Sequence, residues 1–99
     1  MSRYTVYRNP ERDGYLLDLQ ADINHHFSTR VVAPLFLVEA LPAYAKTLNP
    51  LFEVEGRRVV MVTQAMAAVP LQMLKQPVMS LEDRRTEIVA ALDLLFQGF

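Results

Sequence analysis

Alternating apolar and polar positions predict two β-strands near the start of the chain. Residues 3–8 are rich in aromatic and β-branched side chains, which favour a pleated strand. Residues 15–22 show the cleanest period of two, which divides their side chains between opposite faces. Between them, residues 9–14 contain a proline and an Asp-Gly pair typical of a tight turn, so the pattern predicts a hairpin. Its second strand sets Tyr15, Leu17, Leu19 and Ala21 against Asp18, Gln20 and Asp22.

The middle of the chain begins with an apolar run that contains a proline. Residues 24–29 form a polar loop, and residues 30–37 resume the apolar pattern around Pro34. Because proline has no N–H to donate to a sheet, we expect this run to be an edge strand, a bulged strand or two shorter strands. Residues 38–48 mix alanine and leucine and predict one irregular turn of helix.

A second hairpin is predicted around Gly56, with arms at residues 51–55 and 57–63. Phenylalanine and valine alternate with glutamate in the first arm, as in a strand with one exposed face. Residues 69–74 form another short apolar run, broken by a proline and closed by Pro77.

The last segment changes to the spacing of an amphipathic helix. Ser80, with Asp83 three residues later, is a suitable N-terminal cap, and Gly98 is placed to end the helix in a left-handed conformation. The apolar face would comprise Leu81, Ile88, Leu92, Leu95 and Phe99, with Val89 and Phe96 beside it and Arg84, Arg85 and Glu87 opposite. Strands followed by one helix predict a β-rich α+β fold, a small antiparallel sheet or half-open barrel with a C-terminal α-helix.

Size and composition limit the classes of function. At 99 residues the chain is expected to form one domain over residues 1–99, and 52% hydrophobic residues can both fill a core and cover a subunit interface. A formal charge of −1 provides no positive field for general nucleic-acid binding. The absence of cysteine excludes disulfides and thiolate metal sites. Because no signal peptide or membrane-spanning run is found, we expect a cytoplasmic protein without a membrane partner.

Few residues suggest catalysis. His25 and His26 could act as bases or metal ligands, but no spaced His, Cys or Glu set completes a metal site, so a solvated loop is the favoured interpretation. Arg57 and Arg58 could hold a phosphate, although such a pair is more often an exposed flank of a hairpin. We therefore expect no catalytic residues, no metal and no cofactor.

Asp18 and Asp22 share a strand face, but their spacing along the strand is too long for a tight carboxylate pair. We expect both to be solvated. No phosphate-binding glycine loop or catalytic triad pattern is found.

The end of the predicted helix is unusually apolar. Phe96, Gly98 and Phe99 would lie at an exposed chain end, where polar residues are more common. One interpretation is that Phe99 folds back and covers the helix end. The other is that the aromatic side chains anchor a partner protein.

Four short segments, in this order, resemble the CcdB family of toxins over essentially the whole chain. They are Leu19-Gln-Ala-Asp-Ile23, Arg30-Val-Val-Ala-Pro-Leu35, Met66-Ala-Ala-Val-Pro70 and Leu94-Leu-Phe-Gln-Gly-Phe99. The resemblance implies a homodimer of the CcdB/MazF fold, an SH3-like half-open barrel with a five-stranded sheet, a smaller sheet and a C-terminal helix near the dimer axis.

The resemblance also implies a function without chemistry. CcdB toxins bind the DNA gyrase A subunit and trap its cleaved-DNA complex, so replication stops. A CcdA-type antitoxin neutralises them with a disordered segment, and the pair represses its own operon, contacting DNA only through the antitoxin. Such systems maintain plasmids.

Carried over to this sequence, the gyrase-binding residues would be Ile23, Asn24, Asp93, Phe96, Gln97, Gly98 and Phe99. Gln97 stands where the family often has tryptophan, Asn24 where it has an apolar residue, and Asp93 often replaces asparagine. Antitoxin contacts would include the turn at residues 8–14 and the loop at residues 41–49.

The sequence leaves two alternative functions open. A MazF-like endoribonuclease on the same fold would use His25 or His26 with arginines such as Arg30 or Arg57 around a scissile phosphate. A degenerate toxin would only bind its antitoxin. The balanced charge and the lack of an obvious basic groove weigh against the ribonuclease.

Overall fold

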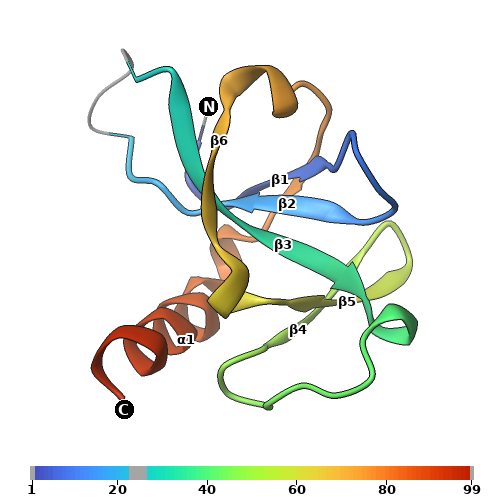
Figure 1. The fold of residues 1–99 in the computed structure, drawn as a ribbon, viewed down its shortest axis with the longest axis vertical. Helices are drawn as coiled ribbons and strands as arrows, with labels where there is room; N and C mark the ends of the chain where they lie inside the picture. Colours follow the sequence, from blue (N-terminus) through green and yellow to red (C-terminus); the bar gives the residue numbers. More distant parts are fainter. Residues whose placement is uncertain (1, 23–26, 99) are drawn as a thin grey trace.

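The structure is a computed structural model that describes residues 2–22 and 27–98. Over these residues the chain forms seven β-strands, four short 3-10 turns and one α-helix (Figure 1). The strands are β1 (Thr5–Arg8), β2 (Tyr15–Asp18), β3 (Thr29–Leu37), β4 (Leu51–Val54), β5 (Arg57–Met61), β6 (Ala67–Pro70) and β7 (Pro77–Ser80). The 3-10 turns are η1 (Val38–Ala40), η2 (Thr63–Ala65), η3 (Leu71–Met73) and η4 (Glu82–Arg84), and the helix is α1 (Arg85–Gln97).

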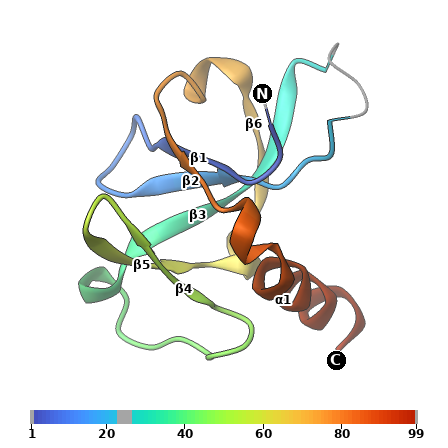
Figure 2. The ribbon, with the colours of Figure 1, turned by 180° about the vertical axis from the view of Figure 1, so that it is seen from behind.

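All strand pairs are antiparallel, in the order β4-β5-β3-β2-β1-β7, and β6 pairs with the first half of β3. The sheet curls into a half-open barrel, and α1 lies across one side of it (Figures 1 and 2). The predicted β-rich α+β class is confirmed. The larger and smaller sheets expected from the resemblance are joined here, because β3 belongs to both.

Both predicted hairpins are confirmed. Strand β1 pairs with β2 through the turn that contains Pro10, and β4 pairs with β5. The second hairpin turns at Glu55 and Gly56, whose φ angles are 54° and 75°. Two consecutive positive φ values in a two-residue loop define a type I′ turn, which suits the twist of the two strands. The irregular turn predicted within residues 38–48 is η1.

The prediction for the run around Pro34 was wrong. Residues Thr29–Leu37 form one continuous strand of 9 residues at the centre of the sheet, neither an edge nor two pieces. On one side β3 pairs with β2 throughout residues 32–35, whereas on the other its partner changes from β6 to β5. The Pro34 carbonyl accepts a bond from the Val62 N–H on this second side, so the missing N–H of Pro34 also faces the change of partner. A central strand tolerates proline where no neighbour needs its donor.

The segment before the helix differs from the prediction in two respects. Residues Pro77–Ser80 form β7, an unpredicted strand that pairs with β1. The helix begins at Arg85, after η4, and the Ser80 Oγ accepts the Glu82 N–H at 3.1 Å. The prediction that Ser80 caps the helix was therefore wrong: Ser80 bonds to the first residue of η4, and the residue before α1 is Arg84. The predicted helix end is confirmed, since Gly98 has a φ of 79° and its N–H bonds to the Leu94 carbonyl.

Two hydrophobic clusters lie on opposite faces of the sheet, because successive residues of a strand point to opposite sides. The larger lies between the sheet and α1 and joins Tyr15, Leu17 and Leu35 to Ile88 and Ala91. Figure 2 shows α1 on this side. The smaller cluster, on the other face, comprises Tyr7, Leu16, Val32 and Leu74, with Val69 and Met73 packed against it.

Candidate functional site

The C-terminal end of α1 presents apolar side chains that the core does not use. The helix buries Ile88 and Ala91 completely, but Phe96, on its last turn, is 71% exposed. An exposed ring of this size contributes little to folding, because burial of apolar area is what stabilises the fold. The structure thus places the Phe96 ring where a partner can cover it.

The predicted gyrase-binding residues fall into two groups. Asp93, Phe96, Gln97 and Gly98 lie together at the end of α1, and all four are exposed. Ile23, Asn24 and Phe99 lie outside the described residues. The interpretation in which Phe99 folds back is therefore untested.

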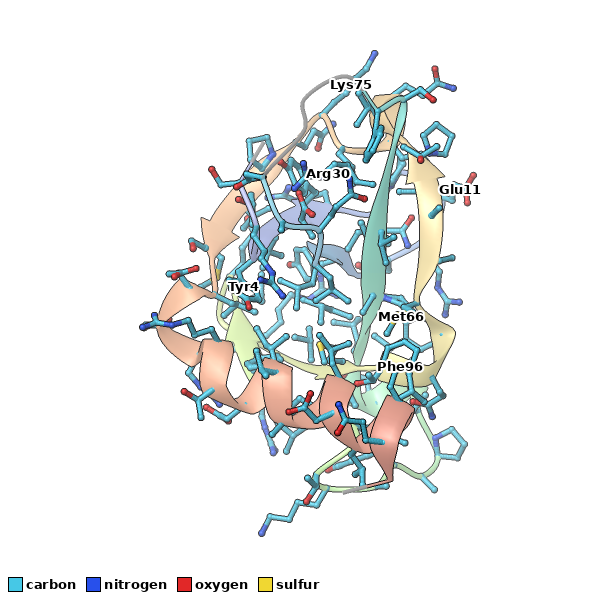
Figure 3. The ribbon with its side chains drawn as sticks, turned by 90° about the vertical axis from the view of Figure 1, so that its left-hand side faces the viewer. Tyr4, Glu11, Arg30, Met66, Lys75 and Phe96 are labelled. Carbon is cyan, nitrogen blue, oxygen red and sulfur yellow. The ribbon has the colours of Figure 1, made fainter. Side chains whose placement is uncertain are left out.

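The helix end and the chain near Arg30 lie toward opposite ends of the molecule. Figure 3 labels Phe96 in the lower half of the molecule and Arg30 in the upper part, and Figure 1 shows α1 and the start of β3 separated along the long axis. Residues 20–22, which lead to Ile23, bond to Arg30. Within one subunit, the helix end therefore lies far from the segment that precedes Ile23 and Asn24.

Charge at the helix end is negative or absent. No basic residue occupies the last turn of α1, and the helix dipole places partial negative charge on its final carbonyls. Asp93 adds a carboxylate one turn earlier. An exposed ring beside weak negative charge suits a partner with an apolar groove and a basic rim.

The expectation that Asp18 and Asp22 are solvated was wrong for Asp18, which is fully buried. Arg30, a residue only 4% exposed, donates from Nε to both oxygens of Asp18, at 3.2 and 3.0 Å. Arg30 also donates to the Gln20 carbonyl at 2.7 Å and to the Asp22 carboxylate at 2.9 Å. The two aspartates thus form no catalytic pair; they meet on one buried cation.

The pKa values of the two aspartates shift in opposite directions. Burial raises the pKa of Asp18, because desolvation outweighs the bonds from Arg30 and from the Gln20 N–H. For Asp22, which is exposed as predicted, the bond from the Arg3 N–H and then that from Arg30 lower the pKa. Through Asp18, Asp22 and Arg30, these bonds connect Arg3 with β2 and β3 at one end of the sheet.

The residues named for a ribonuclease do not form a phosphate site in the described chain. Arg30 is buried, and its Nε and Nη2 groups already bond to Asp18, Gln20 and Asp22, which leaves it unsuited to bind a phosphate. Arg57 pairs with Asp13 at 2.7 Å. His25 and His26 lie outside the described residues. Over residues 2–22 and 27–98, no three His, Cys, Asp or Glu side chains gather as metal ligands would.

A groove of about 420 Å³ runs between the loop at residues 44–51 and the N-terminal half of α1. Its walls include Tyr44 and Lys46 from the loop and Arg84 and Glu87 from the helix side. Arg84 pairs with Glu87 and also donates to the Leu51 carbonyl at 3.2 Å, next to the free edge of β4. The groove thus combines apolar surface with the Arg84–Glu87 ion pair on its helix side.

The predicted exposed flank at Arg57 and Arg58 is confirmed, since both are exposed at the start of β5. Arg57 pairs with Asp13 on the β1–β2 turn, and Glu55 pairs with Arg8. These contacts join two hairpin turns that lie more than 40 residues apart in the sequence. Sequence reasoning missed them because alternation along one strand carries no information about which distant turn lies beside it.

Across the described part of the chain, no helix combines the length and the apolar character that crossing a membrane requires.

The family of this protein is shown by a match over nearly the whole sequence. The sequence matches the family model CcdB, described as CcdB protein, over residues 3–98, which include every strand and the helix described above. The chain therefore belongs to the CcdB family and is a toxin of a toxin–antitoxin system.

Proposed function

We propose that this toxin binds the A subunit of DNA gyrase, traps the complex in which gyrase holds cleaved DNA, and so blocks replication. The observation that carries the proposal is the exposed Phe96 ring at the end of α1, followed directly by Gln97 and Gly98. An aromatic side chain that becomes buried at the centre of an interface can supply a large part of the binding energy. The toxin would act in the cytoplasm, by binding alone.

Gln97 and Gly98 determine how closely a partner can approach this ring. Gly98 adopts a left-handed conformation and has no side chain, so the partner backbone can come near the helix end. Gln97 offers an amide where the family often has an aromatic ring. The amide can form hydrogen bonds but buries less apolar area, so we expect weaker gyrase binding than a tryptophan there would give.

The toxin is proposed to act as a homodimer. The helix end and the segment that precedes Ile23 and Asn24 lie apart in one subunit, so one subunit alone does not join them in a single surface. A second copy would bring the two groups of one subunit beside those of the other. The high apolar content of the chain supports such an interface.

The family implies an antitoxin partner, and we propose a CcdA-type antitoxin that contacts the turn at residues 8–14 and the loop at residues 41–49. The first surface is exposed from Pro10 to Asp13, and the second forms a wall of the groove beside α1. A disordered segment could fill such a groove and order as it binds. DNA would be contacted only through the antitoxin.

The test is a gyrase cleavage assay with the purified toxin. We expect wild-type toxin to raise the amount of linear DNA that remains covalently attached to gyrase, and Phe96→Ala to reduce this about tenfold or more, as for loss of an interface anchor. Val89→Ala is the matched control, because Val89 is also exposed on α1 but lies two turns before the helix end. Cleavage that is unchanged by wild-type toxin would contradict gyrase poisoning and leave a protein that only binds its antitoxin.

A further inference from the structure

Two hairpin turns are held together by a set of side chains that we call the turn bridge: Arg8, Asp13, Tyr15, Glu55 and Arg57. The Glu55 carboxylate accepts a hydrogen bond from Arg8 and a second from the Tyr15 hydroxyl at 2.8 Å. Arg57 donates to Asp13 at 2.7 Å. The turn at residues 9–14 is therefore held from outside by the turn between β4 and β5.

Glu55 occupies a backbone conformation that glutamate rarely adopts. Its φ is 54°, and it is the first central residue of a type I′ turn, a position that favours asparagine or glycine. A strained residue persists where its surroundings require it and often marks a function. Here the glutamate side chain does what an asparagine would be too short to do, since it reaches both Arg8 and Tyr15.

The turn bridge orders the turn at residues 9–14 more than it stabilises the fold. The side chains of Arg8, Asp13 and Arg57 are 53%, 67% and 42% exposed, and exposed ion pairs contribute little to stability. Tyr15 differs, because it is only 2% exposed and is anchored in the core. Its hydroxyl therefore fixes Glu55, and Glu55 in turn fixes Arg8 at the start of the β1–β2 turn.

We propose that Glu55 and Arg57 are positioning residues for antitoxin recognition: they hold the turn at residues 9–14 in the conformation that the antitoxin binds. This inference rests on the proposed antitoxin contact with that turn. A disordered antitoxin segment must lose conformational freedom when it binds, so a turn that is already ordered lowers the total cost. Glu11 and Arg12, which are exposed at the tip, would be the side chains presented to the antitoxin.

The first test replaces Glu55 with asparagine. Glu55→Asn suits the positive φ better than glutamate does, so the melting temperature should stay equal or rise. Affinity for a CcdA-type antitoxin that rescues growth of cells expressing the wild-type toxin should fall about threefold to tenfold, as expected when one or two side chains must be ordered on binding. Glu53→Asn is the matched control, because Glu53 carries the same charge on the same hairpin, is exposed, and lies opposite Arg58 in the sheet and not beside the turn. A merely structural role of Glu55 would lower affinity only together with the melting temperature.

The second test reverses the other ion pair. Arg57→Asp places two carboxylates together and should weaken antitoxin binding by a similar factor, and adding Asp13→Arg should restore it, because the pair forms again with opposite polarity. Binding would be measured by isothermal titration at low and high salt, and the difference between wild type and Arg57→Asp should shrink at high salt. Failure of the double variant to recover would overturn the positioning role.

The double replacement Glu11→Ala with Arg12→Ala distinguishes the antitoxin contact with the turn from the positioning role of Glu55 and Arg57. If it leaves antitoxin affinity unchanged, the proposed antitoxin contact with the turn is wrong. If it weakens binding while Glu55→Asn binds like the wild type, the contact stands and the positioning inference is overturned.

Discussion

Asp18 and Arg30 illustrate what a single residue can decide in this fold. They are 0% and 4% exposed, and each meets the charge of the other inside the protein. A buried ion pair need not stabilise a protein compared with an apolar pair, but removal of one partner leaves a charge without compensation. The effect of mutation at this pair should therefore depend on whether one residue or both are changed.

We predict that Arg30→Met lowers the free energy of unfolding by about 3–5 kcal/mol, because it leaves the Asp18 carboxylate buried and unpaired. Adding Asp18→Asn removes that charge and keeps an acceptor for the Gln20 N–H, so the double variant should be more stable than Arg30→Met alone. Urea unfolding of the three proteins measures this. Equal stability of the single and double variants would show that the charge of Asp18 is tolerated without its partner.

At the scale of elements, α1 has two ends with different roles. Its first half buries Ile88 against the sheet, whereas its last turn holds Phe96 in solvent. The apolar side chain of Ile88 thus anchors the helix on the sheet, whereas that of Phe96 is left exposed. The sequence pattern could not separate these roles, because an exposed and a buried apolar residue look alike in a helical repeat.

We predict that Ile88→Ala costs about 2–5 kcal/mol of unfolding free energy, as for other truncations of fully buried aliphatic side chains. Phe96→Ala should change it by only about 0.5 kcal/mol or less, as for a surface substitution, despite removing a larger side chain. Thermal and urea unfolding measure both variants. A large loss of stability in Phe96→Ala would mean that the ring is covered by the toxin itself, through a second subunit, and not left free for gyrase.

The surfaces that we propose for binding gyrase and the antitoxin lie apart on the molecule. The helix end and the Arg30 end of the sheet lie toward opposite ends of the molecule. The turn at residues 9–14 and the groove beside α1 are the further surfaces that we propose for the antitoxin.

We predict that the purified toxin sediments as a dimer, with twice the mass of the 11.3 kDa chain, and dissociates only on dilution. Analytical ultracentrifugation over a range of concentrations tests this. A monomer that still promotes gyrase cleavage would show that the dimer is unnecessary for poisoning.

The sequence predicted those elements whose signals are local. Both hairpins and the end of α1 at Gly98 follow from alternation, turn residues and a glycine at the required φ. The prediction failed at Pro34 and Asp18, because both depend on neighbours from other strands. Pro34 is tolerated where β3 changes partner. Asp18 lies opposite Val32 on β3 and is buried because the Arg30 side chain, two residues earlier on that strand, reaches its carboxylate.

The candidate site could be predicted only in part, for the same reason. The apolar residues at the end of α1 were visible in the sequence, but only the structure shows that Phe96 is the exposed one among them. The groove and the turn bridge were not visible, because each brings together segments that are distant in the sequence. Such contacts leave no periodic signal along the chain.

The change of partner along β3 bears on how the protein folds as it is synthesised. The residues of β3 emerge from the ribosome before both β5 and β6, and its first half waits for residues 67–70 before that side is paired. Until then, one edge of the longest strand stays open and can pair with another chain. Nascent toxin should therefore be most prone to misassociate before β5 arrives, when this whole edge is open, and the first half of β3 should stay open until β6 arrives.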